Sequence, residues 1–157
     1  GEFLTDTRGT GIMASTFDGY GPFLGARKTR ARGVLIVMDP GTTYTYSLAR
    51  LQDRGILFIG NQTPVYAGMI LGENDREQDM IVNPCVNKKH SNVRSAGADE
   101  KLFLTPAKVH SLEEALAYIE DDELIEITPN HLRLRKRFLD HNLRKRMEKK
   151  AATVTAS

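Results

Sequence analysis

The segment 83–101, NPCVNKKHSNVRSAGADEK, gathers the side chains of this sequence that are best suited to bind an anion. Lys88, Lys89, His90 and Arg94 follow one another with no acidic residue among them. Lys and Arg neutralise phosphates, and Asn and Ser side chains add hydrogen bonds that fix orientation. The segment has little to bury, whereas the flanking runs GMILGE and LFLTP are apolar. We therefore expect a long functional loop, mobile without its partner, on a rigid β scaffold.

Other chemistry in this segment is less well supported by the sequence. Cys85 and His90 suggest a nucleophile and a base, but five residues of polar loop provide no preorganised geometry for the pair. NKKH differs from the guanine-reading pattern NKxD, because His90 cannot accept two base N–H groups as a carboxylate does. The sequence also contains no GxxxxGK[ST] loop, no HExxH and no paired cysteines. We expect neither GTP hydrolysis nor a metal centre from this chain itself.

Charge is segregated in the last third of the chain. Seven carboxylates lie between residues 113 and 126 without a single Lys or Arg, and a strongly basic stretch follows. Side chains two residues apart share one face of a strand, which groups Arg133, Arg135 and Arg137 as a second candidate surface for the phosphates of nucleic acid. The alternative is that these arginines pair with Glu123 and Glu126 across a hairpin. The sequence leaves both interpretations open.

Short apolar runs separated by turn signals indicate the scaffold that must position these residues. GVLIVM, YTYSLA, ILFIG and GMILGE predict strands of a small barrel-like β domain. Ser111 and Glu114 have the spacing of a capping box, and the apolar residues that follow predict one helix. DDELIEIT and HLRLRKRF predict a hairpin around a Thr-Pro-Asn turn, and DHNLRKRMEKK predicts a basic helix or frayed tail. The predicted fold class is α+β and β-rich.

The composition limits the cellular compartment that we expect for the protein. The chain has 157 residues, of which 40% are hydrophobic and 27% charged, with a net charge of +2. One cysteine excludes an internal disulfide and favours a reducing compartment. No apolar run approaches the roughly 18 residues of a membrane span, and no signal-peptide pattern opens the sequence. We expect a cytoplasmic protein without a membrane partner.

Residues 1–20 begin without Met and have an apolar helical start followed by the bend RGTG. Met13, Phe17 and Tyr20 are most simply interpreted as core residues. The absence of a start signal suggests a piece of a longer protein. We expect this segment to pair with another copy or to be poorly ordered.

Longer strings carry a resemblance to a known family. EFLTDTRGTGIM, LQDRGILFIG, VYAGMILGEN, VNKKHSNVRSAGADE and DDELIEITPNHLRLRKRFL resemble, in order and spacing, the C-terminal part of the TypA/BipA family. These proteins are translational GTPases related to elongation factor G. The resemblance implies that residues 1–32 are a helix-strand remnant of a ferredoxin-like α/β-sandwich, the fifth domain, followed by a basic linker. Residues 33–147 would be the family-specific C-terminal domain, and 148–157 a disordered tail.

The resemblance also implies a function. The family binds the ribosome, hydrolyses GTP with Mg²⁺ in the full-length protein, and is linked to ribosome assembly and stress. Its C-terminal domain meets rRNA and the acceptor end of A-site tRNA, so we expect cytoplasmic, ribosome-associated RNA binding, no DNA partner and no cofactor in this chain. The tRNA-facing loop of the family falls on residues 87–98 here. The implied contacts are Asn87, Lys88, Lys89, Ser91, Asn92 and Arg94.

Two other classes of function stay open at this point. In the first, the binding surface is the acidic segment 111–123, which would dock a basic protein, and the loop at 87–98 is not the binding surface. An enzyme that uses Cys85 as its nucleophile is the other alternative, and it rests on the lone thiol described above.

Overall fold

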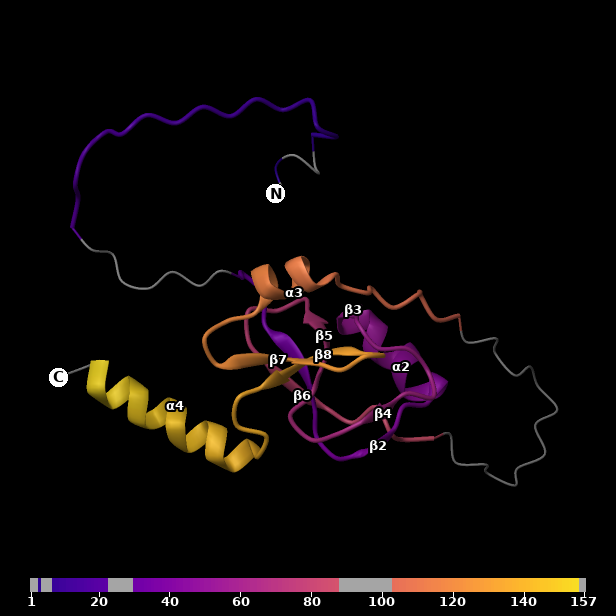
Figure 1. Ribbon diagram of the computed structural model, residues 1–157. Helices are drawn as coiled ribbons and strands as arrows, with labels where there is room; N and C mark the ends of the chain where they lie inside the picture. The colour runs from indigo at the N-terminus through magenta and orange to yellow at the C-terminus, as the bar shows by residue number, and fades with distance from the viewer. Residues whose placement is uncertain (1–2, 4–6, 23–29, 88–102, 156–157) are drawn as a thin grey trace, which may run out of the picture.

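The computed structural model describes residues 3, 7–22, 30–87 and 103–155. Figure 1 shows a central body of short strands, with helix α4 extending away from it. The helices are α2 (Thr45–Leu51), the 3-10 helix η1 (Gln52–Arg54), α3 (Leu112–Tyr118) and α4 (His141–Thr155). The strands are β1 (Val34–Val37), β2 (Gly41–Thr42), β3 (Gly55–Leu57), β4 (Pro64–Val65), β5 (Ile70–Asn74), β6 (Met80–Val82), β7 (Glu123–Ile127) and β8 (Leu132–Lys136).

The central sheet has four strands in the order β3-β5-β1-β6. Strand β1 pairs antiparallel with β5 and parallel with β6, so the sheet is mixed. All four residues of β1, VLIV, are buried. A continuous apolar run of this kind is typical of a strand whose two faces are both covered.

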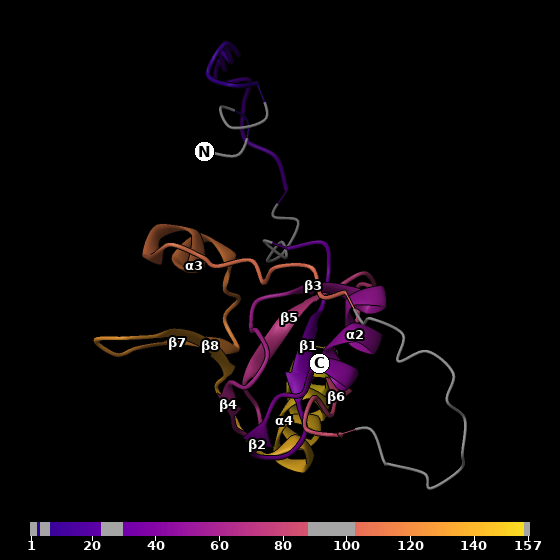
Figure 2. The same ribbon diagram turned by 90° about the vertical axis from the view of Figure 1, so that its right-hand side faces the viewer.

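Two different layers cover the two faces of this sheet (Figure 2). Leu35 and Val37 belong to one apolar cluster with Leu48 and Leu51 of α2. The alternate β1 residues, Val34 and Ile36, belong to a second cluster, which also contains Ala115 of α3 and Leu134 of β8. The period of two along β1 therefore divides its side chains between α2 on one face and α3 with the β7–β8 hairpin on the other.

The predicted hairpin is confirmed. Strands β7 and β8 pair antiparallel from Glu123 opposite Lys136 to Ile127 opposite Leu132. At the turn, the Thr128 N–H donates to the carbonyl of His131 at 2.9 Å. The hairpin joins the body through the backbone N–H of Lys136, which donates to the carbonyl of Gly68 at 2.9 Å.

Gly68 is a position where only glycine fits. Its φ of +83° is left-handed, and a Cβ there would come within 2.7 Å of the Cα of Leu139. The turn before β5 thus approaches the chain between β8 and α4 too closely for any side chain.

The predicted capping box of α3 is also confirmed. The N–H of Glu114 donates to the Ser111 hydroxyl at 3.2 Å, and the Ser111 N–H donates to the Glu114 carboxylate at 2.8 Å. Ala115 is fully buried, whereas Leu112 and Leu116 are 41% and 59% exposed. Only part of the predicted apolar face therefore packs on the body.

The prediction of a strand at YTYSLA is wrong, because Thr45–Leu51 form helix α2. Thr and Tyr favour strands, but Leu48 and Leu51 are three residues apart and both are buried on the sheet. Packing of this helical face overrides the local propensity. The barrel is not found either, since the described strands form three open sheets of four, two and two strands. The coarser prediction of a strand-rich α+β fold is confirmed.

The prediction that Met13, Phe17 and Tyr20 are core residues is wrong. Their exposed fractions are 74%, 76% and 100%. Residues 7–22 contain no helix or strand, so the described part of this segment does not show the predicted sandwich remnant. The apolar faces of the central sheet are already covered by α2, α3 and the hairpin, which leaves no core site for these side chains.

Helix α4 begins after Asp140, whose carboxylate accepts from the N–H of Leu143 at 2.7 Å. This is the contact of an N-cap residue with the third helical position. The helix then continues to Thr155 and includes most of the stretch 148–157 that the sequence assigns to a disordered tail. Of the two alternatives for DHNLRKRMEKK, the basic helix is the one found, over residues 141–150 of α4.

Candidate nucleic-acid interface

Most of the predicted loop contacts, Lys88, Lys89, Ser91, Asn92 and Arg94, lie outside the described residues. So does His90, the proposed base for Cys85. The structure describes the two stems of this loop, residues 83–87 and 103–108, and Asn87 is the last residue before the gap.

The stem before the loop is held by helix α2. The N–H of Tyr44, which precedes α2, donates to the carbonyl of Pro84 at 3.0 Å. The hydroxyl of Ser47 in α2 donates to the carbonyl of Val86. Pro84 and Ser47 are buried, whereas Tyr44 and Val86 are exposed, so these contacts are only partly shielded from water.

The stem after the loop is held by the continuation of the same helix. Gln52 of η1 donates through its side-chain amide to the carbonyl of Phe103 at 2.9 Å. Its amide oxygen accepts from the N–H of Thr105 at 3.1 Å. The N–H of Lys108 then donates to the carbonyl of Leu57 in β3 at 2.8 Å. Both stems are therefore anchored on the layer formed by α2, η1 and β3.

Cys85 lies in the first of these stems. Burial raises the pKa of its thiol, and the nearby charge of Asp39 raises it further. A nucleophilic cysteine needs the opposite shift, toward the thiolate. The described surroundings of Cys85 therefore fit an unreactive thiol.

The hairpin arginines have different surroundings. Arg133 donates to the carboxylate of Glu126 at 3.4 Å, so the alternative of cross-strand pairing holds for this residue. Arg135 donates to the carbonyl of Lys136 at 3.3 Å. Arg137 lies beyond the end of β8 and is exposed.

Glu126 has a second partner, because the Tyr66 hydroxyl donates to its other carboxylate oxygen at 2.5 Å. This hydrogen bond, with a smaller contribution from Arg133, lowers the pKa of Glu126. The hairpin face of Arg133 and Arg135 is therefore partly neutralised by a fixed carboxylate.

Glu123 does not pair with these arginines. It forms a two-point ion pair with Arg30, at 3.0 Å to one guanidinium nitrogen and 2.9 Å to the other. The ammonium group of Lys136 lies 3.0 Å from the same carboxylate and also pairs with Asp79 at 2.7 Å and Asp122 at 2.8 Å. The Glu123 side chain is fully buried, and those of Arg30 and Lys136 are 8% and 3% exposed. We call Arg30, Asp79, Asp122, Glu123 and Lys136 the ion cluster.

The charges of the ion cluster are fixed by one another. Burial alone lowers the pKa of Arg30 and of Lys136, but the carboxylates around them outweigh this effect and raise both. Burial likewise raises the pKa of Glu123, but Arg30 and Lys136 outweigh it and lower the pKa overall. Arg30, Glu123 and Lys136 therefore stay ionised at neutral pH, and their pairing joins residue 30 to the hairpin.

Sequence reasoning missed this role of Arg30. It placed Arg30 in a basic linker and Lys136 in a basic stretch, because both lie beside other cations in the sequence. Lys136 lies on the same face of the strand as Leu132 and Leu134, because the three are two residues apart. This spacing was the sequence signal that Lys136 is buried. Arg30, the linker residue that shares the Glu123 carboxylate with Lys136, had no local signal at all.

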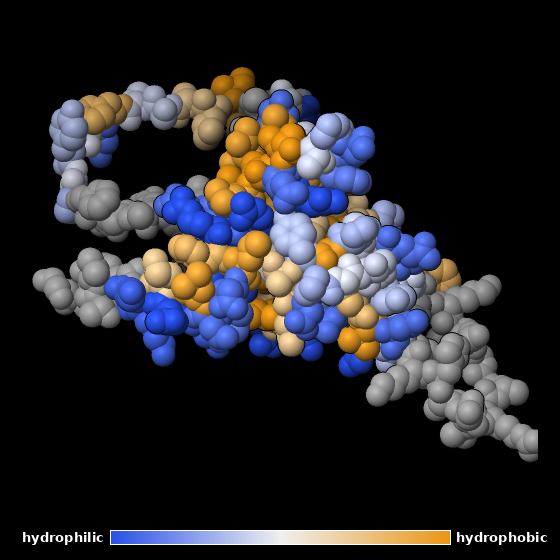
Figure 3. All heavy atoms as spheres, turned by 60° about the horizontal axis from the view of Figure 1, so that its bottom comes forward, coloured by the Kyte–Doolittle hydropathy of each residue, from blue (hydrophilic) through white to orange (hydrophobic). Residues whose placement is uncertain are grey.

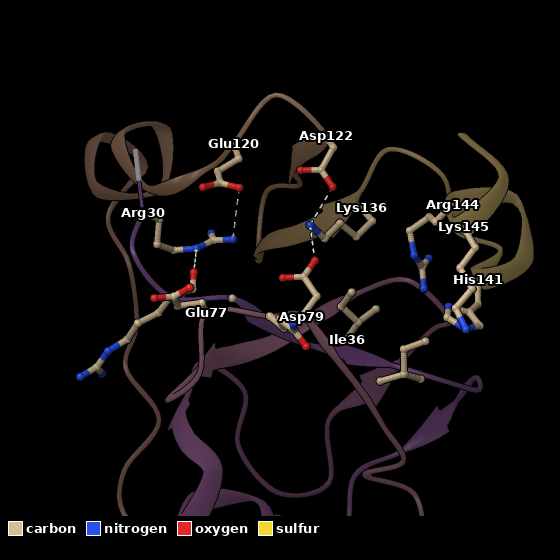
Figure 4. A pocket seen from close by; sticks show the side chains of 14 residues that line it. Arg30, Ile36, Glu77, Asp79, Glu120, Asp122, Lys136, His141, Arg144 and Lys145 are labelled. Carbon is tan, nitrogen blue, oxygen red and sulfur yellow. Dashed lines mark hydrogen bonds and ion pairs between the residues drawn. The ribbon is translucent and has the colours of Figure 1, made fainter. Parts of the chain in front are cut away.

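A pocket of about 460 Å³ lies beside the ion cluster (Figure 4). On one side the carboxylates of Glu77, Asp79, Glu120 and Asp122 lie among the cations Arg30, Arg32 and Lys136, and the other side carries His141, Arg144 and Lys145 from α4. The Arg144 guanidinium donates to the carbonyls of Phe138 and Leu139, both at 2.7 Å. Charges of both signs therefore line this pocket, and Asp79 and Asp122 pair with Lys136 within it.

Helix α4 presents a mixed surface. Lys145, Arg146 and Lys150 are exposed. Leu143 and Met147, one turn apart, are 40% and 41% exposed. Figure 3 shows hydrophilic side chains beside apolar ones on this helix.

The described residues offer no group of three or more His, Cys, Asp and Glu side chains placed to hold a metal ion. Within the same residues, no helix has both the length and the apolar character that crossing a membrane requires.

Comparison with known proteins places the chain. A family model described as the TypA/BipA C-terminal domain matches residues 32–141. The chain belongs to the TypA/BipA family. It is 43% identical over 157 residues to the large ribosomal subunit assembly factor BipA of Bacillus subtilis. The aligned region covers 99% of this chain and 26% of that protein. Identity to the protein of the same name from Salmonella typhimurium is 45% over 146 residues, covering 92% and 24%. The chain thus spans about a quarter of the length of these curated relatives.

The match to the TypA/BipA domain includes the structural features described above. Both loop stems, the hairpin and Lys136 lie within residues 32–141, whereas α4 contributes only its first residue. Arg30 lies just outside the match. The resemblance to this family in the sequence is confirmed.

Proposed function

We propose that this chain is the ribosome-docking, RNA-contacting C-terminal module of a translational GTPase. The relatives are named large ribosomal subunit assembly factors, which supports the large subunit as the partner. GTP and Mg²⁺ would act in other domains of the full-length protein. The setting of this module would be the cytoplasm, on the ribosome.

The anchored loop stems carry this proposal. Helix α2 and η1 hold both ends of a segment that contains Lys88, Lys89 and Arg94. A loop fixed at both stems presents its cations from one place on the scaffold, so that the backbone of an RNA strand can contact several of them together. The target we propose is rRNA together with the acceptor end of tRNA in the A site, since single-stranded ends are the RNA elements that proteins recognise by their splayed bases.

The experiment measures binding of the purified chain to large ribosomal subunits and to tRNA at several salt concentrations. If the loop neutralises about four phosphates, the slope of log affinity against log salt is about −3. The variant Lys88→Ala/Lys89→Ala/Arg94→Ala is expected to bind more weakly, with a slope smaller by about 2.

A matched control removes three exposed cations from other regions, Arg8→Ala/Arg76→Ala/Lys150→Ala. This control changes the net charge equally and is expected to retain most of the binding. Equal loss in both triple variants would mean that only overall charge matters, and undiminished binding by the loop variant would refute the role of the loop.

A second function is favoured by one observation on helix α3. Leu112 and Leu116 are exposed beside Glu113, which gives α3 an apolar and acidic surface suited to a basic protein. Of the acidic segment 111–123, however, Asp122 and Glu123 belong to the ion cluster. Loss of ribosome binding in Glu113→Lys, with no effect of the loop variant, would favour this protein-docking function.

A further inference from the structure

A second groove lies at the other end of β8 from the ion cluster. It has a volume of about 290 Å³ and is formed by the segments 58–60, 69–70, 108–110 and 130–134, with Thr63 beside them. We call it the β8 groove. The hairpin, the chain after the loop and the central sheet each contribute described residues to it.

The charge of the β8 groove is unlike that of the pocket beside the ion cluster. None of the fourteen described residues that line the groove is Asp or Glu. Its lining includes four basic residues, Lys108, His110, His131 and Arg133. Lys108 and His131 are exposed, and Arg133 shares its charge with Glu126, which does not line the groove. A groove with this rim attracts an anionic ligand.

The floor of the β8 groove is apolar and aromatic. Met69, Ile70 and Leu134 are 2%, 1% and 4% exposed and form a rigid base. The Phe58 ring meets the His110 ring edge to face, with centroids 4.4 Å apart. Burial, together with the charge of Lys108, lowers the pKa of His110, so that its imidazole is neutral at pH 7.

These features together select one class of ligand. A volume of about 290 Å³ lies at the lower limit for small-molecule sites, which suits a single base and its sugar. Proteins bind unpaired RNA bases by stacking on aromatic, His or Arg side chains and by hydrogen bonds to the base edges. Asn130 and His131, both exposed at the hairpin turn, supply such hydrogen-bonding groups.

We propose that the β8 groove binds one unpaired nucleotide of RNA, with the base over the apolar floor and the phosphate near Lys108 and Arg133. This rests on the proposed function and extends it, because it gives the chain a second RNA contact separate from the loop. The backbone bond from Lys108 to Leu57 fixes this part of the rim to the central sheet. The groove thus has a built edge that does not depend on the loop residues.

The test is an NMR titration of the 157-residue chain with AMP, CMP, GMP and UMP. Binding is expected to shift the side-chain signals of Ile70, Leu134, His110 and His131. Lys108→Gln is expected to weaken binding about fivefold, because it removes one charged phosphate contact. The matched control Arg76→Gln removes an exposed cation in the β5–β6 turn and should leave affinity unchanged.

Three further measurements decide the outcome. Inorganic phosphate that produces the same shifts at the same concentration would overturn the base-binding part, and an acidic peptide with one Phe that binds there more tightly would point to a protein partner instead. Nucleotide shifts confined to other regions, or no shifts, would refute the proposal. Asn130→Ala serves as a second variant, since an exposed turn residue can be changed without disturbing the fold, and it should weaken nucleotides but not phosphate.

The loop variant Lys88→Ala/Lys89→Ala/Arg94→Ala distinguishes this proposal from the proposed function. It is expected to keep the nucleotide shifts in the groove even where it loses ribosome binding. If nucleotides bind in the groove and the loop variant binds ribosomes normally, the groove proposal stands and the role of the loop is refuted. If the loop variant loses ribosome binding and no nucleotide binds in the groove, the role of the loop stands and the groove proposal is refuted.

Discussion

The two ends of strand β8 place cations in opposite situations. At one end Lys136 is buried, with three carboxylates within 3.0 Å of its ammonium group. At the other end Arg133, together with Lys108 and His131, borders a groove whose described lining has no carboxylate. Basic residues of one strand thus have two roles. Lys136 forms buried ion pairs that stabilise the fold, whereas Arg133 borders a groove that a partner can reach. A count of Lys and Arg along the chain overestimates the binding surface, because buried partners decide which cations are available.

The largest expected effect tests the structural end of this comparison. Glu123→Ala removes the carboxylate that Arg30 and Lys136 share, and leaves two buried cations with fewer partners. We expect a loss of about 3–5 kcal/mol in the free energy of unfolding, measured by urea denaturation.

The matched control for this variant is Glu113→Ala, an exposed carboxylate in the first turn of α3. It should cost no more than about 1 kcal/mol, since it loses only a favourable interaction with the helix dipole. Similar losses in the two variants would show that the ion cluster is not the structural centre we describe.

A smaller effect is expected between the two ends of the strand. Leu134 is 4% exposed and packs on Val34, Ile36 and Ile70 of the central sheet. Leu134→Ala should lower the free energy of unfolding by about 3 kcal/mol through lost burial and a cavity. Since Leu134 also lines the β8 groove, nucleotide binding should weaken in the same variant. If Leu134→Ala keeps both its stability and its nucleotide affinity, Leu134 contributes neither to the hairpin core nor to the binding site in the groove.

Acid should affect the two ends at different pH values. The lowered pKa of His110 means that the folded protein binds fewer protons there than the unfolded chain, whose His pKa is about 6.5. The stability contributed by neutral His110 is fully present above pH 6.5 and is lost as the pH falls through the folded pKa. Glu123 also has a lowered pKa, so its contribution is present above 4.5 and declines only below that value.

Urea denaturation between about pH 7.5 and pH 3 should therefore show two declines in stability. His110→Phe is expected to remove the first decline and keep the second. A profile that is flat down to pH 4.5 in the unmodified chain would contradict the assignment of neutral His110 to the groove end.

The smallest effects concern the rim of the groove. Arg133→Gln breaks a partly exposed pair with Glu126 and should cost about 0.2–1 kcal/mol, less at high salt. Lys108→Gln should leave stability within about 0.5 kcal/mol of the original, because its side chain is exposed. A large loss of stability in Lys108→Gln would mean that this cation serves the fold, as Lys136 does.

Local signals in the sequence predicted the elements whose contacts are close along the chain. The α3 capping box joins residues three apart, and the hairpin pairs strands across a short turn, so both were predictable. Helix α2 was not, because burial of Leu48 and Leu51 against the sheet overrides the strand preference of Thr45 and Tyr46.

The site followed the same rule. The two-point pair of Arg30 with Glu123 spans 93 residues, and no pattern in the sequence indicates it. The cross-strand pair of Arg133 with Glu126 spans only seven and was among the alternatives. The β8 groove, which combines four separate segments, becomes visible only when the chain is folded.

The anchoring of both loop stems on α2, η1 and β3 has a consequence for divergence within the family. Because Ser47, Gln52 and Leu57 fix the two stems, the segment between them can change in length or sequence while its attachment points stay in place. Doubling the length of a flexible loop costs only about 0.6 kcal/mol in closure entropy. Under the proposed function, exchange of this segment would change the RNA preference while the domain that carries it keeps the same fold.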